Sequence, residues 1–91
     1  MKANKEIIKD TLSRKEFMFN NVNFPSIATI MKFVKINLQM NRMSMDYYYE
    51  IDADELAKSK ITQDILNQMK DEGWAYNDKN DTVILYLKNK N

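Results

Sequence analysis

The chain has 91 residues, of which 44% are hydrophobic and 30% charged, and its formal net charge is +1. This length predicts a single domain over residues 1–91 with one modest core, and the composition is typical of globular proteins. The lack of histidine and cysteine, with a single glycine, excludes imidazole and thiolate catalysis, the usual zinc sites, disulfides and glycine-rich phosphate loops.

The first predicted element is a helix that begins after Asn4 and ends near residues 20–21. Asn4 is a good N-cap residue, and Ile8, Leu12 and Phe19 repeat at helical spacing along one side. Pro25 restricts the residue before it to extended geometry, so residues 20–26 are predicted to form a loop.

The segment 27–33 fits two interpretations. Its isoleucines and threonine are β-branched, which favours a strand, and we predict a strand on that ground. The apolar residues at 27, 30, 31, 34 and 38 also follow a helical stripe, so a helix over residues 26–40 is the alternative.

The strongest pattern runs from Val34 to Ile51. Apolar and polar residues alternate up to Met40 and again from Met43, which predicts two half-buried strands joined by a two-residue turn at Asn41 and Arg42. This register places Met40 opposite Met43 and sends Tyr47 to the core.

Residues 53–72 are predicted to form one unbroken helix. Asp52 and Glu55 have the spacing of a capping box at its start, and Gly73 supplies the left-handed residue that ends it. A hairpin over residues 74–87 follows, with a last strand that is apolar on both faces and therefore central. The expected fold is a two-layer α+β sandwich of order helix, strand, strand, helix, strand, strand, with a four-stranded, mostly antiparallel sheet.

The C-terminal half resembles the second half of a winged helix-turn-helix domain, in which a reading helix is followed by a β-hairpin wing. The resemblance is carried by Glu55-Leu56-Ala57, Ile61-Thr62, Met69 to Trp74 and Thr82 to Leu85. It implies DNA binding, and the winged helix is the alternative fold. The spacing departs from the pattern, because residues 53–72 fit one helix of about 30 Å, and Asp64 and Asp71 on the reading helix would repel phosphate.

Carboxylates are the remaining chemistry for a metal-dependent reaction, and they occur as Asp52 with Asp54, Asp71 with Glu72, and Asp78 with Asp81. Each pair has an ordinary role as a helix cap, a helix end or a turn. We therefore expect no enzymatic activity, no cofactor and no metal site.

The longest uncharged apolar run, 24–31, is shorter than the ~20 residues that cross a bilayer, and no signal-like segment is present, so we expect a cytoplasmic protein without membrane contact.

Three binding functions remain. The first is a protein-interaction domain, a regulator or inhibitor that binds a partner or a second copy, with contact residues Met31, Phe33, Met40, Arg42, Met43 and Tyr48. The second is nucleic-acid binding through the basic first half, with Lys2, Lys5, Lys9, Lys32, Lys35 and Arg42. The third is acidic mimicry of a nucleic acid by residues 46–81. The bias towards lysine and asparagine is typical of AT-rich genes and favours a bacterial or phage origin.

Overall fold

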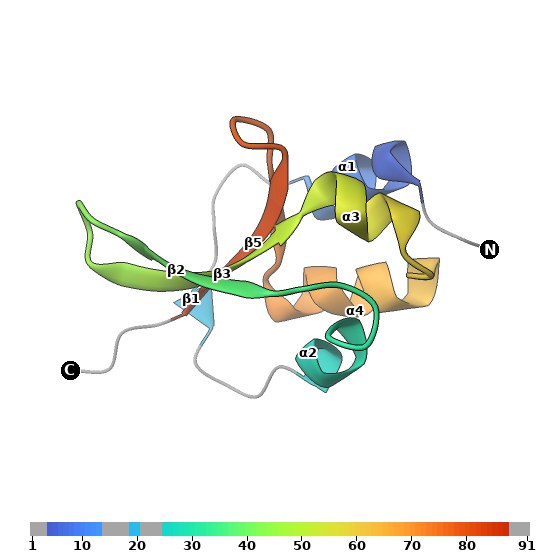
Figure 1. Cartoon of the computed structure of the whole chain (residues 1–91), viewed down its shortest axis with the longest axis horizontal. Helices are drawn as coiled ribbons and strands as arrows, with labels where there is room; N and C mark the ends of the chain where they lie inside the picture. The colour runs from blue at the N-terminus through green and yellow to red at the C-terminus, as the bar shows by residue number, and fades with distance from the viewer. Residues whose placement is uncertain (1–3, 14–18, 21–24, 88–91) are drawn as a thin grey trace.

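The computed structural model describes residues 4–13, 19–20 and 25–87. The predicted α+β class is confirmed: helices accompany an antiparallel sheet, with a short parallel strand added to it (Figure 1). The helices are α1 (Lys5–Leu12), α2 (Pro25–Ile30), α3 (Ala53–Lys58) and α4 (Gln63–Glu72). The strands are β1 (Phe19–Asn20), β2 (Asn37–Asn41), β3 (Asp46–Asp52), β4 (Ala75–Asn77) and β5 (Thr82–Leu87).

The sheet is built around β5. This strand pairs antiparallel with β3 on one side and with β4 on the other, and beyond β4 its end pairs in parallel with β1. The strand β2 pairs with β3 and ends the described sheet on that side. Val83, Ile84 and Leu85 are all buried, so the prediction of a central last strand is confirmed.

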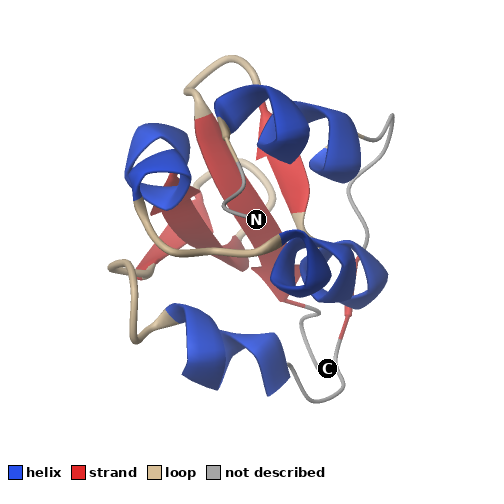
Figure 2. Ribbon diagram, turned by 90° about the vertical axis from the view of Figure 1, so that its right-hand side faces the viewer, coloured by secondary structure: helices blue, strands red, loops and turns tan. Residues whose placement is uncertain are grey.

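The core lies between the helices and one face of the sheet. Ile51 of β3 is paired with Val83 of β5, and both are buried against Ile8, Leu56 and other apolar side chains of the helices. Figure 2 shows the helices lying in front of the strands when the molecule is viewed from its helical end. The β2–β3 hairpin projects to the other side, away from the helices (Figure 1). None of the described helices is long and apolar enough to span a bilayer.

The first helix is shorter than predicted. Asn4 caps it as expected, since its Oδ1 accepts a hydrogen bond from the backbone N–H of Ile7 at 2.9 Å. The helix ends at Leu12, because Ser13 has extended backbone geometry, and the strand β1 occupies positions that were predicted to be helical. The burial of Ile8 and Leu12 already completes the apolar side of this helix.

The strand prediction for residues 27–33 is wrong, and the helical alternative is correct for part of it. Helix α2 begins at Pro25, whose fixed φ angle suits the first turn of a helix. Ile30 is fully buried and Ile27 packs against the core, so burial of this helical side overrides the β preference of the branched residues.

The prediction of one unbroken helix over residues 53–72 is also wrong. Helix α3 ends at Lys58, four residues form a turn, and α4 begins at Gln63. Two side chains stabilise the break: Ser59 Oγ donates to Leu56 O at 2.6 Å, and Thr62 Oγ1 accepts from the N–H of Ile65 at 3.4 Å. Ile61 lies between them and is fully buried, so the turn itself is packed against the core. The predicted caps at Asp52 and Gly73 are confirmed.

Candidate functional site

The hairpin between β2 and β3 has a four-residue connection, where two residues were predicted. Asn41 Oδ1 accepts from the backbone N–H groups of Met43 at 3.0 Å and Ser44 at 3.4 Å, which is the turn chemistry that asparagine side chains favour. Met45 then takes a left-handed φ of 63° and donates its N–H to Asn41 O at 2.7 Å. The predicted register is therefore wrong: Met40 pairs with Tyr47, and Leu38 pairs with Tyr49.

One face of this hairpin continues the core face of the sheet. Ile51, Tyr49 and Tyr47 lie on the same side of β3, because alternate residues of a strand share a face. Ile51 is fully buried and Tyr49 packs against the core, but Tyr47 is 48% exposed. Their neighbours on β2 follow the same trend, with Leu38 57% and Met40 38% exposed. We call Leu38, Met40 and Tyr47 the apolar hairpin face.

The tip of the hairpin adds two methionines to this exposed surface. Met43 is 97% exposed and Met45 is 58% exposed, so neither contributes to the core. Methionine has an unbranched, polarisable side chain that adapts to irregular surfaces. The tip is thus an adaptable apolar end of a two-stranded element.

The residues predicted to bind a partner do not all lie together. Met40, Arg42 and Met43 belong to the hairpin and its turn, whereas Met31 and Phe33 follow α2 at the helical end of the molecule and are 63% and 40% exposed (Figure 1). Tyr48 lies on the opposite face of β3, as predicted, where its ring stacks at an angle on Tyr86 with centroids 5.2 Å apart. Burial raises the pKa of the Tyr48 hydroxyl.

Two residues of this surface, Leu38 and Tyr47, were predicted to face the core and are exposed. The alternation of apolar residues identified the correct face for Tyr47, but it does not show how far along the hairpin the helices extend. The sequence carries no signal for the place where the helical layer ends, so the exposure of Tyr47 could not be predicted from it.

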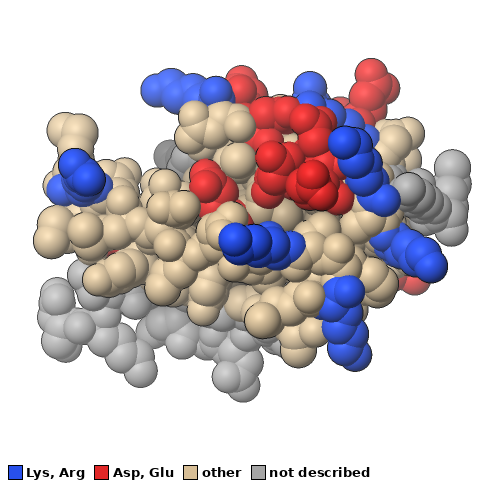
Figure 3. Space-filling view, in the orientation of Figure 1, with Lys and Arg blue, Asp and Glu red and all other residues tan. Residues whose placement is uncertain are grey.

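The residues predicted to contact nucleic acid are dispersed. Lys5 on α1 is bound to carboxylates, and Lys9 Nζ lies 5.5 Å from the centre of the Tyr76 ring. Lys32, Lys35 and Arg42 are exposed at separate places after α2, before β2 and at the hairpin tip, while Lys2 lies outside the described residues. Figure 3 shows Lys and Arg spread over this side of the molecule rather than gathered in one patch.

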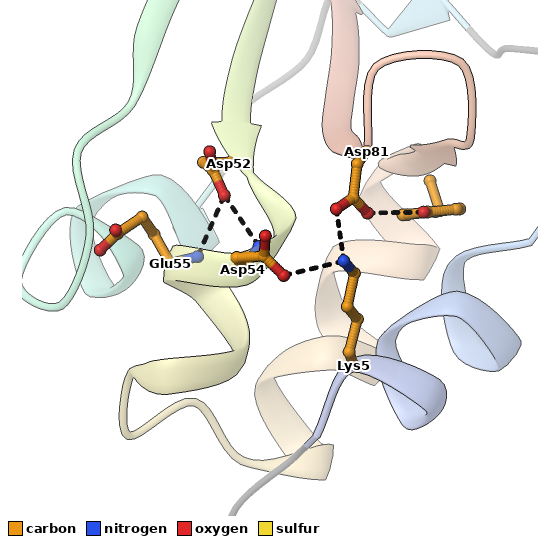
Figure 4. Close-up of polar contacts among 6 residues, drawn as sticks. Lys5, Asp52, Asp54, Glu55 and Asp81 are labelled. Atoms are coloured by element: carbon orange, nitrogen blue, oxygen red, sulfur yellow. Dashed lines mark hydrogen bonds and ion pairs between the residues drawn. The ribbon is translucent and has the colours of Figure 1, made fainter.

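Acidic residues gather where α3 begins beside the turn that precedes β5 (Figure 3). Lys5 Nζ donates to Asp54 Oδ1 at 2.8 Å and also to Asp81, and the hydroxyl of Tyr76 donates to Asp81 at 2.6 Å (Figure 4). Lys5 and then Tyr76 lower the pKa of the Asp81 carboxyl through their hydrogen bonds to it. The pKa of Lys5 is raised by its hydrogen bonds to Asp54 and then to Asp81. This network joins α1, α3 and the β4–β5 turn.

The network gives little support to metal binding or to acidic mimicry. Asp52 is occupied as a helix cap, accepting from the N–H groups of Asp54 and Glu55, and Lys5 interrupts the negative surface. Within the described part of the chain, no group of three or more acidic side chains is arranged to hold a metal ion.

A shallow hollow lies on the other face of the sheet, between the hairpin and the β4–β5 turn. Its volume is about 510 Å³, and Tyr48, Ile84, Tyr86 and Lys79 are among its lining residues. The remaining lining residues include Tyr76 and residues 77–80 at the β4–β5 turn.

Comparison of the chain with models of known protein families, with curated proteins and with solved structures found no match.

Proposed function

We propose that this protein is a non-enzymatic interaction domain that binds a protein partner through its apolar hairpin face. The observation that supports this proposal is the exposure of Leu38, Met40 and Tyr47 on a face that is continuous with the core. Apolar surface gains about 25 cal/mol per Å² when it is removed from water. A partner that covers these side chains therefore gains free energy that folding of the chain alone does not.

The shape of the hairpin fits this role. Its strands are paired continuously from Asn37–Glu50 to Asn41–Asp46, so the backbone that carries the exposed side chains is already ordered before a partner binds. A preorganised surface loses less conformational entropy on binding than a flexible one does. The two methionines beside it, Met43 and Met45, adapt to the partner's surface. A domain of this kind acts by occupying a surface of its partner, as a regulator or an inhibitor does.

The proposal is tested by retention of a partner in extracts of the source cell. A tagged full chain is compared with the double variant Leu38→Ser and Tyr47→Ser, and with Gln68→Ser on the exposed side of α4 as the matched control. We expect a protein that is retained by the wild type and the control but lost by the double variant. Retention of every bound protein by the double variant would contradict the proposal.

Nucleic-acid binding is the second candidate, and the break between α3 and α4 favours it. Two helices joined by a four-residue turn are the arrangement of a helix-turn-helix, and the β4–β5 hairpin follows at the place of a wing. The β4–β5 hairpin pairs through β5 with β3, which is the strand that precedes α3. Residues 53–72 therefore accommodate two helices and the turn between them, as a winged helix requires.

The charge of α4 argues against this second function. Its exposed residues include Asp64 and Asp71, which stand on either side of Asn67 on the outer face of the helix. Carboxylates at a surface that must approach phosphates reduce affinity. Binding of a random-sequence DNA duplex, followed by fluorescence anisotropy at several salt concentrations, separates the two functions. A tight complex with a steep salt dependence that is strengthened by Asp64→Asn with Asp71→Asn would favour nucleic acid.

A further inference from the structure

The outer edge of β2 is the feature from which this inference starts. Among the described residues no strand pairs with β2 on the side away from β3. Its sequence, Asn37-Leu38-Gln39-Met40-Asn41, contains no charged residue, no proline and no bulge, and Lys35 and Arg42 lie just outside it. Charged residues, prolines and bulges within an edge strand are the features by which monomeric proteins prevent that strand from pairing with other chains, and β2 has none of them. The edge is therefore competent to accept another strand.

The sequence of this strand reads almost the same in both directions. Reversal about Gln39 exchanges Asn37 with Asn41 and exchanges the apolar Leu38 with the apolar Met40. A two-fold symmetric interface requires that the same surface be complementary to itself. An antiparallel pair of β2 strands centred on Gln39 meets this requirement, because each residue meets a residue of its own chemical kind.

From this edge and its symmetry we propose that two copies of the chain pair through β2, antiparallel and centred on Gln39, so that their sheets become one continuous sheet. The proposal rests on the proposed function, since Leu38 and Met40 belong to the apolar hairpin face.

The pairing completes the apolar contacts that the hairpin lacks. Leu38 of one copy would lie opposite Met40 of the other, and their exposed fractions of 57% and 38% would fall as they cover each other. Residues directly opposite in antiparallel strands have Cβ atoms about 5 Å apart. The row on this face would then read Tyr49, Leu38, Met40, Tyr47 across the two copies, with the last two from the second copy.

The charges allow this arrangement. On the other face, two rows of side chains would cross the interface. The first row is Glu50 and Asn37 of one copy followed by Asn41 and Asp46 of the other. The second row is Tyr48 and Gln39 of one copy followed by Gln39 and Tyr48 of the other. No two like charges are adjacent in either row. A strand pair of five residues is smaller than the interfaces of about 800 Å² per partner that hold stable complexes, so we expect a reversible, concentration-dependent dimer.

The test uses the position on the symmetry axis. Gln39 is exposed and faces its own copy, so Gln39→Lys places two lysines opposite each other, and Gln39→Glu places two glutamates there. Sedimentation equilibrium of the full chain should show a dimer for the wild type and a dimerisation constant weakened at least about tenfold for each variant. An equimolar mixture of the two variants should recover dimers, and native mass spectrometry should show that they contain one copy of each.

The controls are Gln68→Lys and Gln68→Glu, which change charge equally at an exposed site on α4 and should leave the dimer intact. A wild-type chain that is monomeric at its highest soluble concentration would overturn the pairing, as would a mixture of the Gln39 variants that fails to recover dimers. The proposed function fails separately. A monomer that retains a protein partner through Leu38 and Tyr47 contradicts only the pairing, whereas a dimer with no Tyr47-dependent partner contradicts only the binding of a different protein.

Discussion

Met40 and Tyr47 lie directly opposite each other in the β2–β3 hairpin, on the face that leads into the core, and both remain partly exposed. Two residues further along β3 lies Tyr49, which packs against the core, and two residues beyond that lies Ile51, which is fully buried. The same face therefore serves folding at one end and is free to bind at the other.

The division of this face predicts how substitutions affect stability. Leu38→Ser with Tyr47→Ser should change the free energy of unfolding by less than about 1 kcal/mol, because exposed side chains lose little when they are shortened. Ile51→Ala should cost about 2–5 kcal/mol, because it leaves a cavity in the core. Urea denaturation monitored through the buried Trp74 measures both. Equal losses would mean that the outer half of the hairpin is part of the core.

The break between α3 and α4 predicts whether a substitution at Thr62 raises or lowers the stability of the protein. Thr62 caps α4 through its hydroxyl, so Thr62→Ala should destabilise the protein by about 1 kcal/mol. If residues 53–72 formed one helix, Thr62 would be in its interior, and alanine there would stabilise the protein by several tenths of a kcal/mol. Thermal unfolding of the wild type and of Thr62→Ala shows whether the substitution lowers or raises stability. Non-helical backbone chemical shifts over residues 59–62 are the independent check.

The network around Lys5 predicts a pH dependence. The folded state holds the pKa of Asp81 below its ordinary value, so its contribution to stability is present at neutral pH and is lost as the pH falls through the folded pKa. In Lys5→Met the titration of the Asp81 carboxyl, followed by NMR, should move up in pH, and the loss of stability in acid should become smaller. Lys58→Met, an exposed change in the last turn of α3, is the control. An unchanged Asp81 titration in Lys5→Met would show that the network does not form in solution.

The parts of the fold that could be predicted are set by local chemistry. Asn4, Asp52 and Gly73 each mark a helix end, because a side-chain oxygen or a left-handed backbone satisfies the free groups there. The apolar residues on both faces of β5 similarly identify the central strand. These signals need no knowledge of distant residues.

The errors arose where distant packing or a single polar side chain decides the outcome. Burial of Ile30 makes 25–30 helical in spite of its β-branched residues, and burial of Ile61 selects the turn between α3 and α4. The hydrogen bonds of the Asn41 side chain lengthen the hairpin turn by two residues and shift the register. The exposure of Tyr47 followed from neither pattern nor propensity, because it depends on where the helical layer ends.

Photo-crosslinking from the apolar hairpin face tests the central claim most directly. A photoreactive phenylalanine derivative replaces Tyr47 in one variant and Asn67, exposed on α4, in the other, and each is irradiated in cells of the source organism. We expect a crosslinked protein, either a different protein or a second copy of this chain, from position 47 and none from position 67. Crosslinks from position 67 with none from position 47 would contradict it and would move the interaction surface to α4.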